Sequence, residues 1–512
     1  MDVKHIKRVI LGDPITIEEF IAVVRYGAQV EFSDEYCRRV QKSRKLLEQW
    51  IQQGRIMYGV NTGFGALCTQ LITEEETIQL QKNILLSHAV SVGEPLTEEE
   101  VRATMLMVLQ NLGQGYSGVR IEVLDMYRQF LNFRLTPFAP REGSVGYLSP
   151  EAHIALVLIG EGKAYVEGEL LPGREALNRI GLKPITLTAK EGLSLISGTT
   201  GATALGALAL YDMLKAATAA DIIGAMTLEV LKGTIRAFDE RLMMVRPHPE
   251  QTDTASNVRN ILKDSTIARH FIDYRLQDAL SLRCIPQLHG AAKKTLRDAL
   301  RVIEIEMNSC CDNPILWTVD GEEDVISGGN ADSSYVGIEM DSACIAATAI
   351  AKMSERRNNR LINDRLSEYP AFLISRPGLN SGLMIPQYAQ AALLNDMKIL
   401  SHPATVDNSP TCADQEDYVA MGYNAAKKAR EAAEKLEYIL AIELLSTYYA
   451  YQFIERDLSP GTASKAIVEQ LSNMVPRVEE DIYLYPYIEL LKEFIHSREI
   501  IECVEQKIGQ LK

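Results

Sequence analysis

The sequence predicts a mainly α-helical protein with a loop-rich first part and a long helical bundle behind it. After about residue 200, apolar residues recur every three to four positions in alanine- and leucine-rich segments, which is the period of an amphipathic helix. Strand-like alternation is short and is confined to stretches such as AYVEGELL and EEDVISGG. We therefore expect a loop-rich N-terminal domain over residues 1–200, which holds the candidate site, and a helical-bundle domain over residues 201–512.

In the first 200 residues, short apolar segments alternate with glycine-containing turns. The main clusters are YGVNTGFG, SVGEPL, GSVGYLSP and ISGTTG. Glycine adopts left-handed backbone conformations at little cost, so repeated clusters indicate loops with special backbone requirements. None of these loops has the spacing of a phosphate-binding motif, which argues against a nucleotide-binding fold.

The second part of the chain predicts long helices. The strongest segments cover residues 201–232, 287–307, 334–356 and 424–455. They are rich in alanine and carry few charges on parts of their surface. This favours burial in an oligomer, and a thick monomer core is the alternative explanation.

Composition excludes several classes of protein. The 512 residues are 46% hydrophobic and carry a formal net charge of −15, which argues against a nucleic-acid partner. No apolar run approaches the ~18 residues of a membrane span, and the N-terminus lacks the apolar core of a signal peptide. There is no CxxC, HxH or HxxxH spacing, so we expect reduced thiols, no metal site and a cytoplasmic location.

Five polar clusters are candidates for a functional site. In a helical protein, a single tyrosine or histidine is usually a satisfied core residue, so no cluster is convincing alone. A buried arginine needs an anionic partner, either an internal carboxylate or the carboxylate of a substrate. The candidates are Tyr58 with Asn61, Ser87 with His88, Arg283, Asn330 with Tyr335, and Gln415 with Glu416 and Tyr418.

Taken together, these clusters closely resemble the histidine and aromatic amino-acid ammonia-lyase family. The matching motifs follow the family order: YGVNTGFG, SHAVSVGEPL, GSVG followed by AHIALVLIGEG, SLRCIPQ, the DNP of CDNPILW, ISGGN, SHPATVDNSPT and DQEDYVAMG. The resemblance spans nearly the whole chain. It implies a mostly helical homotetramer with active sites shared between subunits. It also implies elimination of an amine from an amino acid to leave an α,β-unsaturated acid.

The resemblance also assigns roles. Ser87-His88 and Gln415-Glu416 are similar to the histidine-specific branch, in which polar groups hold an imidazole-type ring. Arg283 is expected to hold the substrate carboxylate as a bidentate pair. Tyr58 is expected to remove the β-proton, for which its pKa must fall from about 10, and helix N-termini pointing into the site are expected to lower it.

One departure from the family pattern changes the expected chemistry. The family makes an electrophile, methylidene-imidazolone (MIO), from an Ala-Ser-Gly triplet that follows GSVG, whereas here GSVG runs directly into Tyr147. Ser197 and Thr200 replace the asparagine and glutamine of a neighbouring family motif, and Leu280 and Ala331 replace family aromatic residues. We therefore predict a protein without MIO, with no external cofactor and no metal.

Without MIO, this sequence resembles the MIO-free relative of the family, ergothionase. Ergothionase eliminates trimethylamine from ergothioneine to give thiourocanate. A quaternary ammonium favours aromatic faces, so Tyr147 is expected to form a wall for it, with Tyr335 and Tyr418 as weaker candidates and Ser197 providing space. Alternatively, Tyr147 fills a void or acts as a second acid or base. Two other functions stay open: a histidine or aromatic ammonia-lyase whose triplet is missing only from the sequence as written, and an inactive structural or binding homologue.

Overall fold

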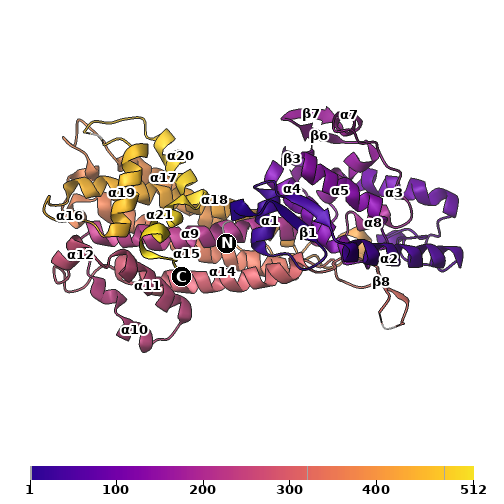
Figure 1. Cartoon of the computed structure of the whole chain (residues 1–512), viewed down its shortest axis with the longest axis horizontal. Coiled ribbons are helices and arrows are strands. Elements are labelled where there is room, and N and C mark those ends of the chain that lie inside the picture. Colours follow the sequence, from indigo (N-terminus) through magenta and orange to yellow (C-terminus); the bar gives the residue numbers. More distant parts are fainter. Residues whose placement is uncertain (1–2, 320, 478) are drawn as a thin grey trace. The chain divides into compact units, whose positions relative to one another are not determined.

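The computed structural model describes residues 3–319, 321–477 and 479–512, and it is mainly helical, as predicted (Figure 1). The chain divides into two compact units. Unit 1 consists of residues 1–208, 300–341 and 403–428, and unit 2 of residues 209–299, 342–402 and 429–512. The expected boundary near residue 200 stays a prediction, and two later segments belong with the N-terminal residues in unit 1.

Unit 1 combines short helices with small sheets. Its helices are α1 (Ile17–Val24), α2 (Asp34–Gln52), α3 (Glu74–His88), α4 (Glu98–Gly113), α5 (Ile121–Phe133), α6 (Glu151–Leu156), α7 (Gly173–Arg179) and α8 (Glu191–Ser194), with 3-10 turns at Val3–His5, Gly65–Leu67, Val157–Ile159 and Cys412–Asp414. The helix starts follow from the sequence. Thr16 and Thr97 each accept a backbone N–H from a glutamate three residues later, and that glutamate side chain accepts the N–H of the threonine.

The strands of unit 1 pair locally and include both predicted stretches. Strand β1 (Arg8–Leu11) pairs in parallel with β2 (Gln29–Phe32), with Val9 opposite Val30. The antiparallel pairs are β3 (Val92–Pro95) with β5 (Pro140–Glu142), β4 (Thr136–Pro137) with β6 (Lys163–Val166), β6 with β7 (Glu169–Pro172), and β8 (Ile315–Trp317) with β9 (Asp324–Ile326). These short strands form separate sheets of two or three strands that connect neighbouring loops, and they do not form one continuous layer.

Unit 2 is built from helices. The long helices are α9 (Thr200–Val230), α14 (Ile285–Met307), α15 (Ser334–Ile362) and α18 (Gly422–Ala450), each with residues in both units. The others are α10 (Glu240–Met244), α11 (Pro249–Ile261), α12 (Thr266–His270), α13 (Leu280–Arg283), α16 (Asp364–Ser367), α17 (Met384–Leu400), α19 (Thr462–Met474), α20 (Tyr485–His496) and α21 (Glu499–Ile508), with 3-10 turns at Ile235–Phe238, Ala371–Leu373 and Tyr451–Phe453. The four predicted long helices are confirmed.

Helix α9 shows why the bundle is so rich in alanine. Nearly all its residues are buried, and a helix that is apolar all round is stable only inside a core. The buried charges of Arg357 and Glu443 inside unit 2 are paired, as burial requires. Arg357 forms a bidentate pair with Glu443, and both side chains are fully buried.

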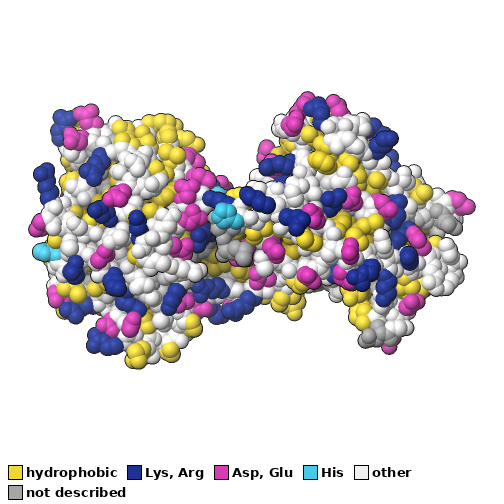
Figure 2. All heavy atoms as spheres, in the orientation of Figure 1, with side chains coloured by type: hydrophobic (Ala, Val, Ile, Leu, Met, Phe, Trp, Pro, Cys, Tyr) yellow, Lys and Arg dark blue, Asp and Glu magenta, His cyan; other side chains and the backbone are white. Residues whose placement is uncertain are grey.

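The face of the molecule that Figure 2 draws carries charges of both signs. On the face drawn in Figure 2, acidic and basic side chains are interspersed over each unit, without a continuous basic area. This agrees with the acidic composition. Within the described residues, no helix is both long and apolar enough to cross a membrane.

Candidate active site

A cavity of about 1040 Å³ lies in unit 1 and gathers most of the candidate residues. Its lining comes from loops and helix ends that are far apart in the sequence, so only the fold brings them together. The lining residues fall in the segments 58–68, 87–90, 143–149, 193–197, 313–332 and 411–420. Of the candidates, Tyr58, Ser87, His88, Tyr147, Ser197, Gln415, Glu416 and Tyr418 line the cavity.

The loop that carries Tyr58 is folded by its own polar groups. The Tyr58 hydroxyl oxygen accepts the N–H of Gly65 at 2.9 Å. Asn61 accepts the N–H of Met57 and donates to the carbonyl of Arg55, each at 2.8 Å, so Asn61 shapes the loop and does not line the cavity. Gly65 has φ +56°, and a Cβ on it would meet the Cys412 Sγ at 2.5 Å, so a side chain there would disrupt the loop packing.

The pKa of Tyr58 is shifted in the direction opposite to the sequence-based expectation. Burial raises the pKa of the phenol, and the negative charge of Glu416 raises it further. The hydrogen bond from Gly65 lowers it, but this single donor does not outweigh burial. Within one chain the pKa of Tyr58 is therefore raised, and its lowering by helix N-termini stays a prediction for the shared site.

His88 is the last residue of α3 and is held in one tautomer. Its Nδ1 lies 2.8 Å from the carbonyl oxygen of Ile84, which can only accept, so Nδ1 carries the proton. Burial lowers the pKa of His88, which favours the neutral imidazole. Nε2 is then an acceptor. Ser87 is 3.0 Å from Nδ1 and donates to the same carbonyl at 3.2 Å, so it supports the end of the helix.

Tyr147 follows the glycine loop directly, as the sequence indicated. Gly146 has φ +147°, and a Cβ on it would meet the Ser333 Oγ at 2.4 Å, so only glycine fits there. The next residue, Leu148, has φ +76°, an uncommon conformation for a leucine. Burial raises the pKa of Tyr147 well above its usual value, and the charge and hydrogen bonding of Glu416 add to this.

The segment 411–420 forms the acidic side of the cavity. Thr411 Oγ1 donates to a carboxylate oxygen of Glu416 at 2.8 Å, and the backbones of the two residues also pair. Between them, Cys412, Ala413 and Asp414 have φ of +53°, +53° and +65°. Left-handed runs of non-glycine residues are strained and tend to occur at functional loops. Tyr418 is hydrogen-bonded to Ser334.

The charges around the cavity have one sign. Asp332, Glu416 and Asp417 line it, and its lining residues include no lysine or arginine. Tyr58, Phe64, Tyr147 and Tyr418 provide aromatic surface. A cavity with carboxylates and aromatic rings suits a cationic ligand, because both groups attract positive charge.

The floor of the cavity is supported by a buried ion pair. Ser197 accepts the N–H of Asn313 at 3.2 Å, and both residues line the cavity. Directly before Asn313, Asp312 accepts from Lys190 at 2.5 Å and from Ser194 at 3.0 Å, and the Lys190 and Asp312 side chains are completely buried. The pair fixes the two segments that carry Ser197 and Asn313.

Besides Asn61, three predicted site residues do not line this cavity. Asn330 is exposed, although its neighbours Gly329 and Ala331 line the cavity. Tyr335 is 74% exposed on α15. Arg283 belongs to unit 2, at the end of α13, where its Nε donates to the carbonyl of Asp278 at 3.0 Å.

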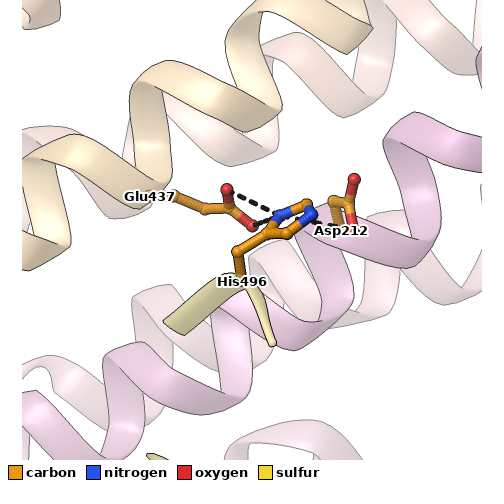
Figure 3. Close-up of side chains that lie close together, drawn as sticks. All are labelled: Asp212, Glu437 and His496. Atoms are coloured by element: carbon orange, nitrogen blue, oxygen red, sulfur yellow. Dashed lines mark hydrogen bonds and ion pairs between the residues drawn. The ribbon is translucent and has the colours of Figure 1, made fainter. Parts of the chain in front are cut away.

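One other cluster has the residue types of a metal site. Asp212, Glu437 and His496 lie together in unit 2, with ligand atoms within 4.8 Å of one another (Figure 3). His496 Nδ1 is 3.0 Å from Glu437. Asp212, however, is already paired with Arg430 and, at 2.9 Å, with Lys215. The basic side chains already neutralise Asp212, and they would repel a metal ion at this position. The cluster is therefore an ion-pair network.

The model of one protein family, aromatic amino acid lyase, matches residues 15–473. The chain belongs to the aromatic amino acid lyase family. A histidine ammonia-lyase from Symbiobacterium thermophilum is 43% identical over 506 residues, which cover 98% of this chain and 99% of the relative. The predicted family, fold and ammonia-lyase type of enzyme are thereby confirmed.

Solved structures of aromatic amino acid lyase relatives share the fold. A histidine ammonia-lyase from Trypanosoma cruzi has a TM-score of 0.91 at 34% identity, covering 98% of this chain and 95% of that one. An ergothionase from Treponema denticola, described as ergothioneine-degrading, has a TM-score of 0.87 at 26% identity, covering 96% and 99%. This chain is thus similar both to histidine ammonia-lyases and to an ergothionase.

Sequence reasoning missed several residues that line the cavity of this aromatic amino acid lyase. Asn313 and Phe64 are part of the recognised motifs DNP and YGVNTGFG, and Asp332 follows ISGGN two residues later, so their position was an available signal. Leu193 is apolar and lies outside these motifs, and any apolar residue also suits a core.

Proposed function

We propose that this lyase eliminates trimethylamine from a betaine with an imidazole-type ring, such as ergothioneine, to give a urocanate-like unsaturated acid, and that it does so without MIO. One observation carries the proposal: the cavity is lined by three carboxylates and four aromatic rings of tyrosine and phenylalanine, and by no lysine or arginine. A permanently cationic substrate matches this lining. The similarity to a solved ergothionase supports the same substrate class.

The residues of the glycine loop do not fit MIO. The group is made from the chain itself, and residues 143–150 read GSVGYLSP, without an Ala-Ser-Gly triplet. In its place stand the Tyr147 ring and the left-handed Leu148. A quaternary amine leaves as a neutral molecule, so its departure does not require that electrophile. The proposed reaction therefore uses neither MIO nor a metal.

The cavity residues supply the remaining steps. The Tyr58 phenolate removes the β-proton, the C–H electron pair forms the new C=C bond, and the C–N electron pair leaves with trimethylamine. Tyr58 then passes the proton to the released amine. Glu416 and Gln415 hold the ring, and His88 Nε2 accepts a ring N–H. From the family resemblance, Arg283 holds the substrate carboxylate. Because Arg283 does not line the cavity within one chain, this role depends on the shared active sites of the proposed homotetramer.

A bound cation changes the pKa of Tyr58. In the empty cavity, burial and Glu416 raise the pKa, whereas an ammonium nearby favours the phenolate and lowers it. A base must be deprotonated to act, so activity is expected to rise with pH. The limb in kcat/KM, which reports the free enzyme, should lie at higher pH than the limb in kcat. Initial rates from pH 7 to 11 measure both, and a flat kcat/KM profile over this range would contradict the assignment.

A substrate panel tests the function directly. The purified protein is incubated with ergothioneine, with hercynine (the sulfur-free betaine) and with histidine, while the conjugated acid is followed by absorbance and the released amine by mass spectrometry. We expect trimethylamine from ergothioneine and no ammonia from histidine. Turnover of histidine alone would favour a histidine ammonia-lyase, which the names of the 41–43% identical relatives support. Turnover of none would favour an inactive homologue.

We also propose a homotetramer with active sites shared between subunits. Large apolar side chains are exposed along α15 at Tyr335, Ile338 and Ile345, and along α17 at Ile385 and Tyr388. Their spacing of three and seven residues on α15 places them on one helix face. Exposed apolar faces are typical of subunit contacts. Mass photometry of the purified protein tests the subunit number.

A further inference from the structure

Asp332 and Asp417 are the two cavity carboxylates without an assigned role, and Asp332 is the less exposed of the two. Asp332 lies just before α15, lines the cavity and is half-buried. One carboxylate oxygen accepts the N–H of Ser334 at 2.9 Å. Among the described residues, no basic side chain forms an ion pair with Asp332 or with Glu416. Within one chain, these two carboxylates therefore face the same cavity without a lysine or arginine in its lining.

Tyr147 lies within reach of both charges. The charges of Glu416 and of Asp332 each raise the pKa of its phenol, in addition to burial. Two negative charges, those of Glu416 and Asp332, therefore act on Tyr147 in a partly enclosed space. The two carboxylates repel each other, and a bound cation would offset this repulsion. An aromatic face combined with a carboxylate is an effective environment for a quaternary ammonium, which has no N–H to donate.

Glu416 and Asp332 differ in the groups that surround their carboxylates. Glu416 is tied to Thr411 at 2.8 Å and influences the pKa of both Tyr58 and His88, so it lies beside the groups proposed for proton removal and ring binding. Asp332 lines the same cavity as Tyr147, and its negative charge raises the pKa of that phenol. An ammonium group placed against the Tyr147 ring would therefore also be attracted by Asp332.

We propose that Asp332 is the counter-charge of the substrate's quaternary ammonium group and determines the preference for a permanently cationic ligand. This inference rests on the proposed function. It has a kinetic consequence, because the positive charge disappears as the C–N bond breaks. Asp332 therefore stabilises the bound substrate more than the transition state, and its loss should raise KM without lowering kcat.

The test compares variants that differ by one charge. Asp332→Asn keeps an oxygen that can accept the Ser334 N–H, so the start of α15 keeps its cap. Asp332→Glu restores the charge. Asp407→Asn removes the same charge from an exposed residue of unit 1 outside the cavity lining and controls for long-range effects.

Two readouts are measured on the full-length protein. The first is steady-state turnover of ergothioneine, for which Asp332→Asn should raise KM about tenfold with kcat equal or higher, the scale of one charge at a few ångströms in a half-buried site. The second is calorimetric binding of tetramethylammonium and of neutral 3,3-dimethylbutanol. Asp332→Asn should weaken the cation about tenfold and leave the neutral ligand unchanged, with Asp332→Glu restoring most of the affinity.

The outcomes separate the inference from the proposed function. If wild-type protein turns over ergothioneine and Asp332→Asn changes neither KM nor cation affinity by more than Asp407→Asn does, the inference is overturned and the function stands. If wild-type protein binds tetramethylammonium in an Asp332-dependent way but releases no trimethylamine, the proposed function fails and the cation site stands. A fall in kcat with unchanged KM would also overturn the inference.

Discussion

Tyr58→Phe is expected to lower kcat by about 100- to 10,000-fold, the usual contribution of a general base. The phenol oxygen is the proposed proton acceptor, and phenylalanine keeps the ring while removing that oxygen. The variant also leaves the N–H of Gly65 without its acceptor at 2.9 Å, so some loss of stability is expected as well. Single-turnover rates with ergothioneine, measured beside thermal unfolding, separate the two effects.

Tyr147→Phe is the matched control for this experiment. It removes a second phenol oxygen from the same cavity and keeps the aromatic face. If Tyr147 is a wall for the ammonium group, kcat should change by less than about tenfold, the scale of a hydrogen-bond loss. If Tyr147→Phe were inactive and Tyr58→Phe active, the roles assigned to the two tyrosines would be reversed.

Asp312→Ala is expected to reduce the free energy of unfolding of unit 1 by about 3–5 kcal/mol, because it leaves the Lys190 ammonium buried without its partner. Both side chains are fully buried, and Ser194 also donates to the same carboxylate. The two tryptophans of the chain, Trp50 and Trp317, lie in unit 1, so their fluorescence during urea unfolding reports on this unit.

The double variant Lys190→Met with Asp312→Leu distinguishes charge from packing. Replacing a buried ion pair by apolar residues is often close to neutral, so the double variant should be more stable than Asp312→Ala alone. Equal destabilisation of the two would show that packing of the aspartate, and not an unpaired charge, dominates. Because the pair holds the segments of Ser197 and Asn313, Asp312→Ala should also raise KM, which turnover assays in the absence of urea measure.

The sequence predicted the helices well because their signal is local. Apolar periodicity identified the four long helices to within a few residues at most ends, and glycine clusters marked the loops that line the cavity. The strands were recognised at AYVEGELL and EEDVISGG for the same reason. The family resemblance of the motifs predicted that Tyr58, His88 and Glu416 share one site, and all three line the cavity.

The assignments that failed or stayed open depend on long-range geometry. Asn61 looked like a ligand-binding residue, but its amide is used to fold its own loop. The pKa of Tyr58 could not be inferred from the motif, because burial and the approach of Glu416 from a segment more than 300 residues later decide its direction. Asp332 escaped notice because a single aspartate before a helix is normally read as a cap.

The sequence by itself determined the family, the helical class and the absence of the Ala-Ser-Gly triplet beside Tyr147, since these are properties of residue order. The tertiary structure decided the charge of the cavity. Segments near residues 58, 88, 147, 332 and 416 meet there, and their carboxylates face aromatic rings without a basic residue in the lining. Electrostatic energy depends on distance in space and on burial, so the proposed preference for a cation could be inferred only from the folded chain.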